Sequence, residues 1–357
     1  MATELKSSPQ RLAVVLFNLG GPDCLEAVEP FLFNLFSDPA IIGAPQPLRY
    51  VLAKLISRRR GPIARDIYAQ LGGGSPLLEQ TTRQSEALQA RLQNVAAPEV
   101  RVFVCMRYWH PLSSETAAAV RQFDPDQVIL LPLYPQFSTT TSGSSLKDWR
   151  RAAKREGLTA PSRTVCCYPA EQGLLDAQVR LIKARLEEAR EAGNPRILFS
   201  AHGLPKKIVA GGDPYQRQVE MTVDGVVEKL TADLGPVDHA VCYQSRVGPL
   251  EWIGPATEEE LERAANDQVP VVVVPVAFVS EHSETLVELD IEYREKAAEL
   301  GIPAYVRVEA VGIAAEFVEG LAGLVVDALS RDGAPSPRDG LRICPPACSQ
   351  CICDAVA

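Results

Sequence analysis

Short runs of apolar residues recur along the chain, and turn residues or polar side chains follow each run. Continuous runs of this kind are typical of parallel β-strands that are covered on both faces. They predict strands at residues 12–18, 101–106, 127–134, 163–168, 196–201, 238–243, 270–276 and 304–310. Longer segments between them predict helices at residues 77–95, 171–192, 215–233, 257–267, 283–300 and 312–330. Strands that alternate with helices indicate an α/β fold.

The order of these segments repeats, with four predicted strands in each half of the chain. We therefore predict two similar Rossmann-like halves, each a four-stranded parallel sheet flanked by helices, with an active-site cleft between them. Polar or aromatic residues follow nearly every strand, and in open α/β sheets ligands bind at the carboxyl ends of the strands. The predicted divisions are a polar N-terminal tail at 1–11, an N-terminal half at 12–170, a bridging helix at 171–195, a C-terminal half at 196–335 and a cysteine-rich tail at 336–357.

The composition narrows the class of protein. Of 357 residues, 46% are hydrophobic and 23% are charged, so the chain can bury a large core. A formal net charge of −9 argues against a nucleic-acid partner, which would favour a basic surface. The polar first residues lack the apolar core of a signal peptide, and no run is long enough to span a bilayer. We expect a cytoplasmic protein.

The segment from Phe31 to Phe36 would present apolar side chains on nearly every side of a helix. Such a helix is either buried all round or leaves an apolar lip exposed to a hydrophobic ligand or a membrane surface. A basic cluster follows at Arg49, Lys54, Arg58, Arg59 and Arg60. The pattern alone leaves both interpretations open for the region at about 28–60.

Gly20 and Gly21 follow the first predicted strand. Their spacing fits neither the dinucleotide-binding fingerprint nor the P-loop. We interpret them as a place where the backbone approaches a flat or bulky ligand closely.

The residues with the clearest chemistry follow two other predicted strands. His202 ends the strand at 196–201, and it is one of only 4 histidines. Beyond the strand at 270–276, Glu281, Glu284 and Glu288 recur at helical spacing and share one face. They form either a solvated acidic helix start or a column that binds a cation or accepts protons. An imidazole beside carboxylates suits a divalent metal such as iron, and it equally suits removal of protons near neutral pH.

Six blocks of sequence, all in order, carry a resemblance to a known family. They are Phe-Asn-Leu-Gly-Gly-Pro at 17–22, Arg-Tyr-Trp-His-Pro-Leu at 107–112, Tyr-Pro-Gln-Phe-Ser at 134–138, Phe-Ser-Ala-His-Gly-Leu-Pro at 199–205, Gln-Ser-Arg-Val-Gly-Pro at 244–249, and residues 278–290. Together they resemble ferrochelatases over roughly residues 12–330. The resemblance implies a lyase of haem biosynthesis, a metal chelatase that inserts ferrous iron into protoporphyrin IX to make protohaem by distorting the macrocycle and removing its pyrrole protons.

The resemblance also implies roles for single residues. His202 matches the active-site histidine of the family and Glu284 its metal-path glutamate, while Glu288 and Asp290 would continue the proton or metal path. Whether His202 takes the pyrrole protons or first holds the iron stays open. Walls for the macrocycle are expected from Leu19, Tyr108, Tyr134 and Trp252. Partners for the propionates are expected from Arg107, Ser75 and Ser138. The segment from Phe31 to Phe36 falls where the family has its pocket lip, which favours an exposed lip and peripheral contact with the inner face of the membrane.

The C-terminal tail carries Cys344, Cys348, Cys351 and Cys353, four of 9 cysteines. A disulfide is disfavoured in a reducing cytoplasm, which leaves thiolate ligation of zinc or of an iron–sulfur cluster. The resemblance implies a [2Fe–2S] cluster, because some ferrochelatases carry one with three ligands in a C-terminal extension. The chain has no cysteine at 138–140, where animal members have the fourth ligand. We expect the four tail cysteines to bind the cluster, with Cys166 or Cys167 as a possible substitute for one of them. Some cluster-bearing relatives form dimers, which implies a possible homodimer.

Three other functions compete with this one. Within the family, the substrate would be coproporphyrin III, which has more propionates to neutralise. From another class, a non-catalytic tetrapyrrole or metal carrier would bind porphyrin without metallating it, although a carrier has no need of proton acceptors beside the metal. A cobalt chelatase of the same fold class would present paired histidines, which His282 beside Glu284 could imitate.

Overall fold

The computed structural model describes residues 9–93, 95–246, 248, 250–331, 337 and 342–353. Most of the predicted N-terminal tail and part of the cysteine-rich tail lie outside these residues, as do Val247 and Pro249 of the fifth sequence block. Every predicted site residue lies within them.

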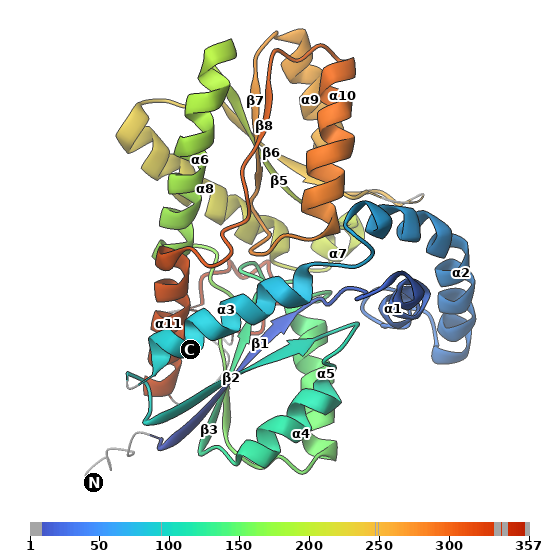
Figure 1. Ribbon diagram of the computed structural model, residues 1–357, viewed down its shortest axis with the longest axis vertical. Helices are drawn as coiled ribbons and strands as arrows, with labels where there is room; N and C mark the ends of the chain where they lie inside the picture. The colour runs from blue at the N-terminus through green and yellow to red at the C-terminus, as the bar shows by residue number, and fades with distance from the viewer. Residues whose placement is uncertain are drawn as a thin grey trace.

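Two four-stranded sheets form the centre of the molecule (Figure 1). The first has the order β2-β1-β3-β4, from β1 (Arg11–Asn18), β2 (Glu99–Met106), β3 (Gln127–Pro132) and β4 (Ser162–Thr164). The second has the order β6-β5-β7-β8, from β5 (Arg196–His202), β6 (His239–Gln244), β7 (Val271–Pro275) and β8 (Tyr305–Arg307). The strand pairs in both sheets are parallel. The predicted fold class is confirmed, with strands β4 and β8 shorter than expected.

The central strands are apolar along their whole length because both of their faces are covered. In β1, Leu12, Val14 and Leu16 point into one core, while Ala13, Val15 and Phe17 point into another. This alternation is the period of two of a β-strand. In β5, Ile197 and Phe199 likewise lie in a different core from Leu198. Because the strands in each sheet are parallel, their carboxyl ends lie at one edge of that sheet, where side chains from different strands can meet.

Helices cover both sheets. The predicted ones are observed as α3 (Leu77–Leu92), α6 (Gln172–Ala189), α8 (Tyr215–Leu234), α9 (Thr257–Asn266), α10 (Tyr293–Glu299) and α11 (Ala315–Ser330). The short α7 (Lys206–Ala210) and the longer α4 (Ser113–Phe123) and α5 (Ser142–Arg155) were not predicted, and α5 opens on a run of serines that is typical of a loop. Although α11 follows the second sheet in sequence, its Phe317, Leu321 and Val325 pack into the core of the first.

The helices α1 (Val28–Phe36) and α2 (Gln46–Gln70) stand together at one side of the molecule, away from both sheets (Figure 1). Phe31 and Leu32 are buried, whereas the other apolar residues of α1 beyond Val28 are partly exposed. The segment is therefore neither a helix buried all round nor a fully exposed apolar lip. Nearby and on α2, large apolar side chains are strongly exposed: Ile41, Leu48, Tyr50, Val51, Leu55 and Ile63. Among the described residues, we find no helix with the length and apolarity that a membrane span requires.

The helix predicted at 283–300 is divided into two parts. Its first part is a π-helix, η3 (Glu284–Glu292), and α10 continues it. π-Helical turns are rare and occur often at functional sites. This one begins at Glu284, opposite the end of β5.

Candidate active site

His202 and Glu284 form an ion pair between the end of β5 and the start of η3. The Nδ1 atom of His202, at the end of β5, lies 2.7 Å from Oε2 of Glu284, the first residue of η3. Burial alone would lower the pKa of His202, but the Glu284 carboxylate outweighs it and raises that pKa above its usual value. Burial would likewise raise the pKa of Glu284, and the imidazolium instead lowers it to about 2. The pair therefore favours a protonated histidine beside an ionised carboxylate.

Glu288 lies one turn further along η3 and behaves differently. Its carboxylate accepts hydrogen bonds from Gln244 Nε2 at 3.0 Å and from the backbone N–H of Ser245 at 2.7 Å. Burial, followed by the charge of Glu284, raises the pKa of Glu288 despite these hydrogen bonds. The Ser245 hydroxyl lies between the two carboxylates, 2.5 Å from Glu288 and 3.4 Å from Glu284. The site thus holds one carboxylate that stays ionised and one that takes up a proton more readily.

His282 and Tyr68 approach the same pair. His282 is buried beside Phe278 at a ring distance of 4.7 Å, and its Nδ1 atom has no hydrogen-bond partner among the described residues. Burial lowers the pKa of His282, which favours the neutral form of this imidazole. Tyr68 reaches across from α2 to the start of η3, where it lies near Ser283 and Glu284, and burial raises the pKa of its hydroxyl. Tyr68 was not predicted, because nothing local in the sequence connects α2 to η3.

Glu281 and Asp290, the carboxylates before and after this group in the sequence, form ion pairs with arginines instead. Asp290 lies 2.7 Å from Arg307, and Glu281 lies 3.0 Å from the same guanidinium. Arg294 also contacts Asp290, at 3.3 Å. The predicted stripe is therefore divided, with Glu284 and Glu288 beside His202, and with Glu281 and Asp290 in a separate ion-pair network.

The four residues that we predicted as walls for the macrocycle differ in how far they are buried. Trp252 lies beside the turn after His202, where its ring meets the position of Gly203, and its Nε1 atom is unpartnered among the described residues. Leu19 is partly buried against the cluster that contains Tyr68 and Tyr108. Tyr108 has no exposed surface, so it supports this cluster from behind and offers no face to a ligand. Tyr134 is half-buried against the core on the other face of the first sheet.

The glycine-rich turn after β1 contacts protein groups. A Cβ atom at Gly21 would lie 2.5 Å from both the Cβ and Oγ atoms of Ser75, and Gly20, at φ +83°, packs against Trp109. The close approach that we expected for a ligand is thus made by the chain itself. Ser75 in turn donates its backbone N–H to the carbonyl of Pro22 at 2.7 Å, and its hydroxyl accepts the backbone N–H of Leu77 at 3.3 Å.

Arg107 and Ser138, the expected propionate partners, are each bound to a buried carboxylate. Arg107 donates to Asp38 at 2.8 Å and to the Ser144 hydroxyl at 2.7 Å. Asp38 also accepts from the Tyr108 hydroxyl at 2.8 Å, and the pKa of Asp38 is lowered by these groups although burial opposes the shift. Ser138 donates to the buried Asp213 at 3.0 Å. Asp38 and Asp213 were not predicted, because isolated aspartates carry no local signal of the partners they meet.

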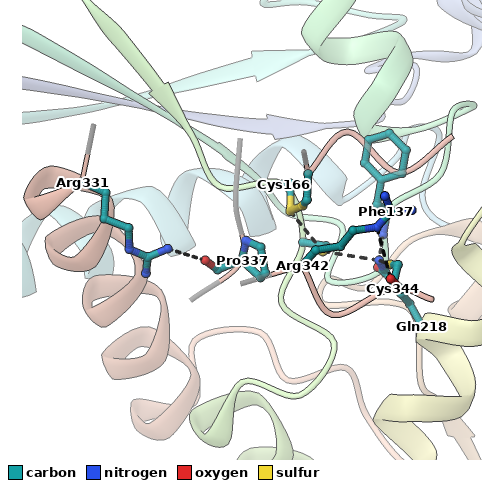
Figure 2. The surroundings of a disulfide bond; sticks show 9 residues. Phe137, Cys166, Gln218, Arg331, Pro337, Arg342 and Cys344 are labelled. Atoms are coloured by element: carbon teal, nitrogen blue, oxygen red, sulfur yellow. Dashed lines mark hydrogen bonds between the residues drawn. A yellow bond between two sulfur atoms is a disulfide. The ribbon is translucent and has the colours of Figure 1, made fainter. Parts of the chain in front are cut away.

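Six cysteines come together where the tail returns to the molecule. They are Cys166, Cys167, Cys344, Cys348, Cys351 and Cys353, and the first two follow β4. The sulfurs of Cys166, Cys167 and Cys353 lie within 4.8 Å of one another and are buried, an arrangement that can hold a metal. The structure joins Cys166 to Cys353 as a disulfide, contrary to the expectation from a reducing cytoplasm (Figure 2).

Two of the remaining thiols, those of Cys344 and Cys351, influence each other's pKa. The neighbouring Cys344 lowers the pKa of the Cys351 thiol, which favours the thiolate form that binds a metal. Gln218 of α8 donates to the Cys344 sulfur at 3.0 Å (Figure 2). A set of soft thiol donors this close together suits zinc or an iron–sulfur cluster.

Comparison with known proteins gives the family. The chain matches the family model described as Ferrochelatase over residues 11–329. A ferrochelatase of Caulobacter vibrioides is 54% identical over 347 residues, which cover 96% of this chain and 98% of that protein. A ferrochelatase of Phenylobacterium zucineum is 53% identical over 344 residues, with coverage of 96% and 98%. Among solved structures, SirB from Bacillus subtilis with Fe³⁺ has a TM-score of 0.52 at 11% identity, covering 90% of this chain and 96% of that one, and this likeness concerns the fold alone. The chain therefore belongs to the ferrochelatase family, the ferro-lyases that insert ferrous iron into a porphyrin.

Proposed function

We propose that the porphyrin is protoporphyrin IX and that the product is protohaem. Arg107 is the only cation among the expected propionate partners, and Asp38 already balances its charge. Such a site suits the two propionates of protoporphyrin better than the four of coproporphyrin III, because each further carboxylate needs its own cationic or hydroxyl partner.

The proposed mechanism is based on one observation, the group formed by His202, Glu284 and Glu288. Metal insertion releases two pyrrole protons, so it needs two acceptors close to the macrocycle. His202 in its neutral form accepts one, because Glu284 stabilises the imidazolium that results. Glu288 accepts the other, because its pKa lies above that of an ordinary carboxylate. Histidine and carboxylates with pKa values moved toward the working pH are the groups that general acid–base chemistry requires.

Two groups support the passage of ferrous iron to the macrocycle. Glu284 stays ionised, and His282 offers a neutral nitrogen without a partner among the described residues. Carboxylate and imidazole ligands together suit a divalent first-row metal. We include Asp290 in neither role, because Arg307 binds it.

Initial rates with the two porphyrins side by side test the choice of substrate. With ferrous iron under anaerobic conditions, we expect a higher kcat/KM for protoporphyrin IX than for coproporphyrin III. The reverse order would replace protoporphyrin with coproporphyrin while leaving the activity itself in place. Binding of both porphyrins without formation of metalloporphyrin would favour a carrier.

We propose further that the cysteine group binds a [2Fe–2S] cluster through Cys166, Cys344, Cys351 and Cys353. The sulfurs of Cys166 and Cys353 are adjacent, and Cys344 and Cys351 influence each other's pKa, so these four residues can supply the thiolates that such a cluster needs. This set replaces Cys348 of the expected tail ligands by Cys166. A bound cluster and the disulfide use the same two sulfurs and exclude each other. When bound, the cluster would supply a redox-active, thiolate-ligated group, and we assign it no step of the insertion reaction.

Absorption and metal analysis of the purified protein test this cofactor. We expect visible absorption beyond about 400 nm together with iron and acid-labile sulfide. The variants Cys166→Ser, Cys344→Ser, Cys351→Ser and Cys353→Ser should lose that absorption, while the matched variant Cys348→Ser should keep it. A colourless, zinc-loaded protein from anaerobic preparation would exclude the cluster.

We also propose that the exposed apolar residues of α2 contact a membrane surface. Val51 and Leu55 are 60% and 62% exposed, and Lys54 lies between them with Arg58 one turn further. Apolar side chains interleaved with cations favour anionic lipid surfaces. A porphyrin is itself apolar, so this contact would bring the enzyme to where its substrate partitions.

A further inference from the structure

Gln218 connects the cysteine group to the loop that follows β3. Its side chain is fully buried on α8, and both ends of its amide make hydrogen bonds. The Nε2 atom donates to the Cys344 sulfur at 3.0 Å and to the Cys167 sulfur at 3.4 Å. The Oε1 atom accepts the backbone N–H of Phe137 at 2.7 Å (Figure 2). One amide thus holds two segments that are far apart in sequence.

The partner at the second end lies next to a residue that we expected to contact the porphyrin. Phe137 precedes Ser138, an expected propionate partner, and its ring packs against Cys166, Cys167 and Cys353. A buried backbone N–H that loses its acceptor costs free energy, so the Oε1 atom of Gln218 contributes to the position of this loop.

A second route joins the tail to the same loop. Gln350 of the tail donates its backbone N–H to the carbonyl of Gly212 at 3.0 Å. The next residue, Asp213, accepts hydrogen bonds from Ser138 at 3.0 Å and from the backbone N–H of Thr139 at 2.8 Å. The cysteine tail and the loop at 137–139 therefore rest on the same short stretch of chain at 212–218.

We propose that Gln218 is a positioning residue that donates a hydrogen bond to a ligand thiolate of the bound [2Fe–2S] cluster and, through its other end, holds the loop at 137–139. Hydrogen bonds to cluster sulfurs help to set the reduction potential, since they stabilise the more negative, reduced state. The proposal rests on the proposed cofactor and goes beyond it, because it couples the cysteine group to the porphyrin side of the site.

Two variants separate the two ends of the amide. Gln218→Glu keeps an acceptor for Phe137 but loses the N–H groups directed at sulfur, whereas Gln218→Met loses both in a side chain of similar length. Gln178→Met is the matched control, because Gln178 is also a buried helical glutamine but donates to the carbonyl of Val276 at 3.1 Å. The measurements are a redox titration followed by visible absorption and the Kd for protoporphyrin IX from fluorescence quenching.

We expect the midpoint potential of the [2Fe–2S] cluster to become more negative in both Gln218 variants and to stay unchanged in Gln178→Met. We expect protoporphyrin binding to weaken several-fold in Gln218→Met and to change less in Gln218→Glu, because only the methionine leaves the Phe137 N–H without an acceptor. Loss of the cluster from folded Gln218→Glu, with the cluster retained in Gln178→Met, also supports the proposal. If Gln218→Met does not fold, the midpoint potential of Gln218→Glu alone tests the proposal.

Two results would overturn the inference, and they can be told apart. An unchanged potential in a cluster-bearing Gln218→Glu variant removes the role of Gln218 and leaves the cofactor standing. A wild-type protein without iron, sulfide or visible absorption removes the proposed cofactor and this inference with it.

Discussion

At the scale of single residues, the site depends on two glutamates of one helix whose carboxyl groups have opposite tendencies. Glu284 pairs with His202 and stays ionised, while burial and then the nearby charge of Glu284 raise the pKa of Glu288. Such pairs of groups, whose environments move their pKa values apart, are typical of acid–base sites. At the end of β6, Gln244 donates to the Glu284 backbone carbonyl and to the Glu288 carboxylate, and the Ser245 hydroxyl contacts both carboxylates.

Removing the charge of Glu284 should change how activity depends on pH. In Glu284→Gln the pKa of His202 falls, because the carboxylate that raises it is gone. His202 then stays neutral down to lower pH, so the acidic limb of the pH profile of kcat/KM moves to lower pH while the maximum rate decreases. Rate measurements across the pH range, with Asp290→Asn as the control, check this. An acidic limb that stays in place would show that His202 is not the titrating group.

A second prediction at this scale concerns the turn after β1. Gly21→Ala should destabilise the protein by about 1–3 kcal/mol, because the added methyl group would overlap the side chain of Ser75. Denaturant unfolding measures the loss. The double variant with Ser75→Gly should recover much of it, and a double variant as unstable as Gly21→Ala would contradict the steric explanation.

Single residues also show which parts of the site a sequence can predict. His202, Glu284 and Glu288 could be predicted, because strand ends and helical spacing are local patterns. Tyr68 and Asp38 could not, because each meets its partners only after distant segments have packed. The sequence likewise placed Arg107 and Ser138 at the site, but it could not show that a buried carboxylate binds each of them.

At the scale of elements, the strands were predicted more accurately than the helices around them. Continuous apolar runs identify buried strands, whereas α5 has a serine-rich start and α2 contains Gly61 and Pro62, both of which weaken a helical pattern. The helix at 283–300 was predicted, but its π-helical first part was not, because hydrogen-bond pattern is not visible in side-chain spacing.

The exposed face of α2 gives a prediction at this scale. The double variant Val51→Glu, Leu55→Glu should bind phosphatidylcholine–phosphatidylglycerol vesicles at least ~10-fold more weakly than wild type, because each buried side chain contributes about 1.5–3 kcal/mol. Vesicle sedimentation measures this. Val326→Glu, an exposed apolar position on α11, is the control and should bind as wild type does. Equal binding by all three proteins would contradict a membrane contact through α2.

At the scale of the whole molecule, two sheets of the same order are held together by elements that cross between them. The bridging helix α6 has Leu174 in the core of the first sheet and Leu175 in that of the second. The last helix returns to the first sheet, and the cysteine tail then meets Cys166 from the first half and Gln218 from the second. The repeat of strands and helices predicts the two sheets. It cannot predict where the last helix and the cysteine tail pack, because an apolar helix can cover either sheet equally well.

The central claim is that His202 takes part in the insertion of ferrous iron into protoporphyrin. Its most direct test is the anaerobic rate of protohaem formation by wild type and His202→Ala, measured together with the Kd for protoporphyrin and the melting temperature. We predict that His202→Ala folds and binds protoporphyrin but loses about 10²- to 10⁴-fold in kcat, the usual contribution of a general acid–base group. Protohaem formation at the wild-type rate by His202→Ala would contradict the account.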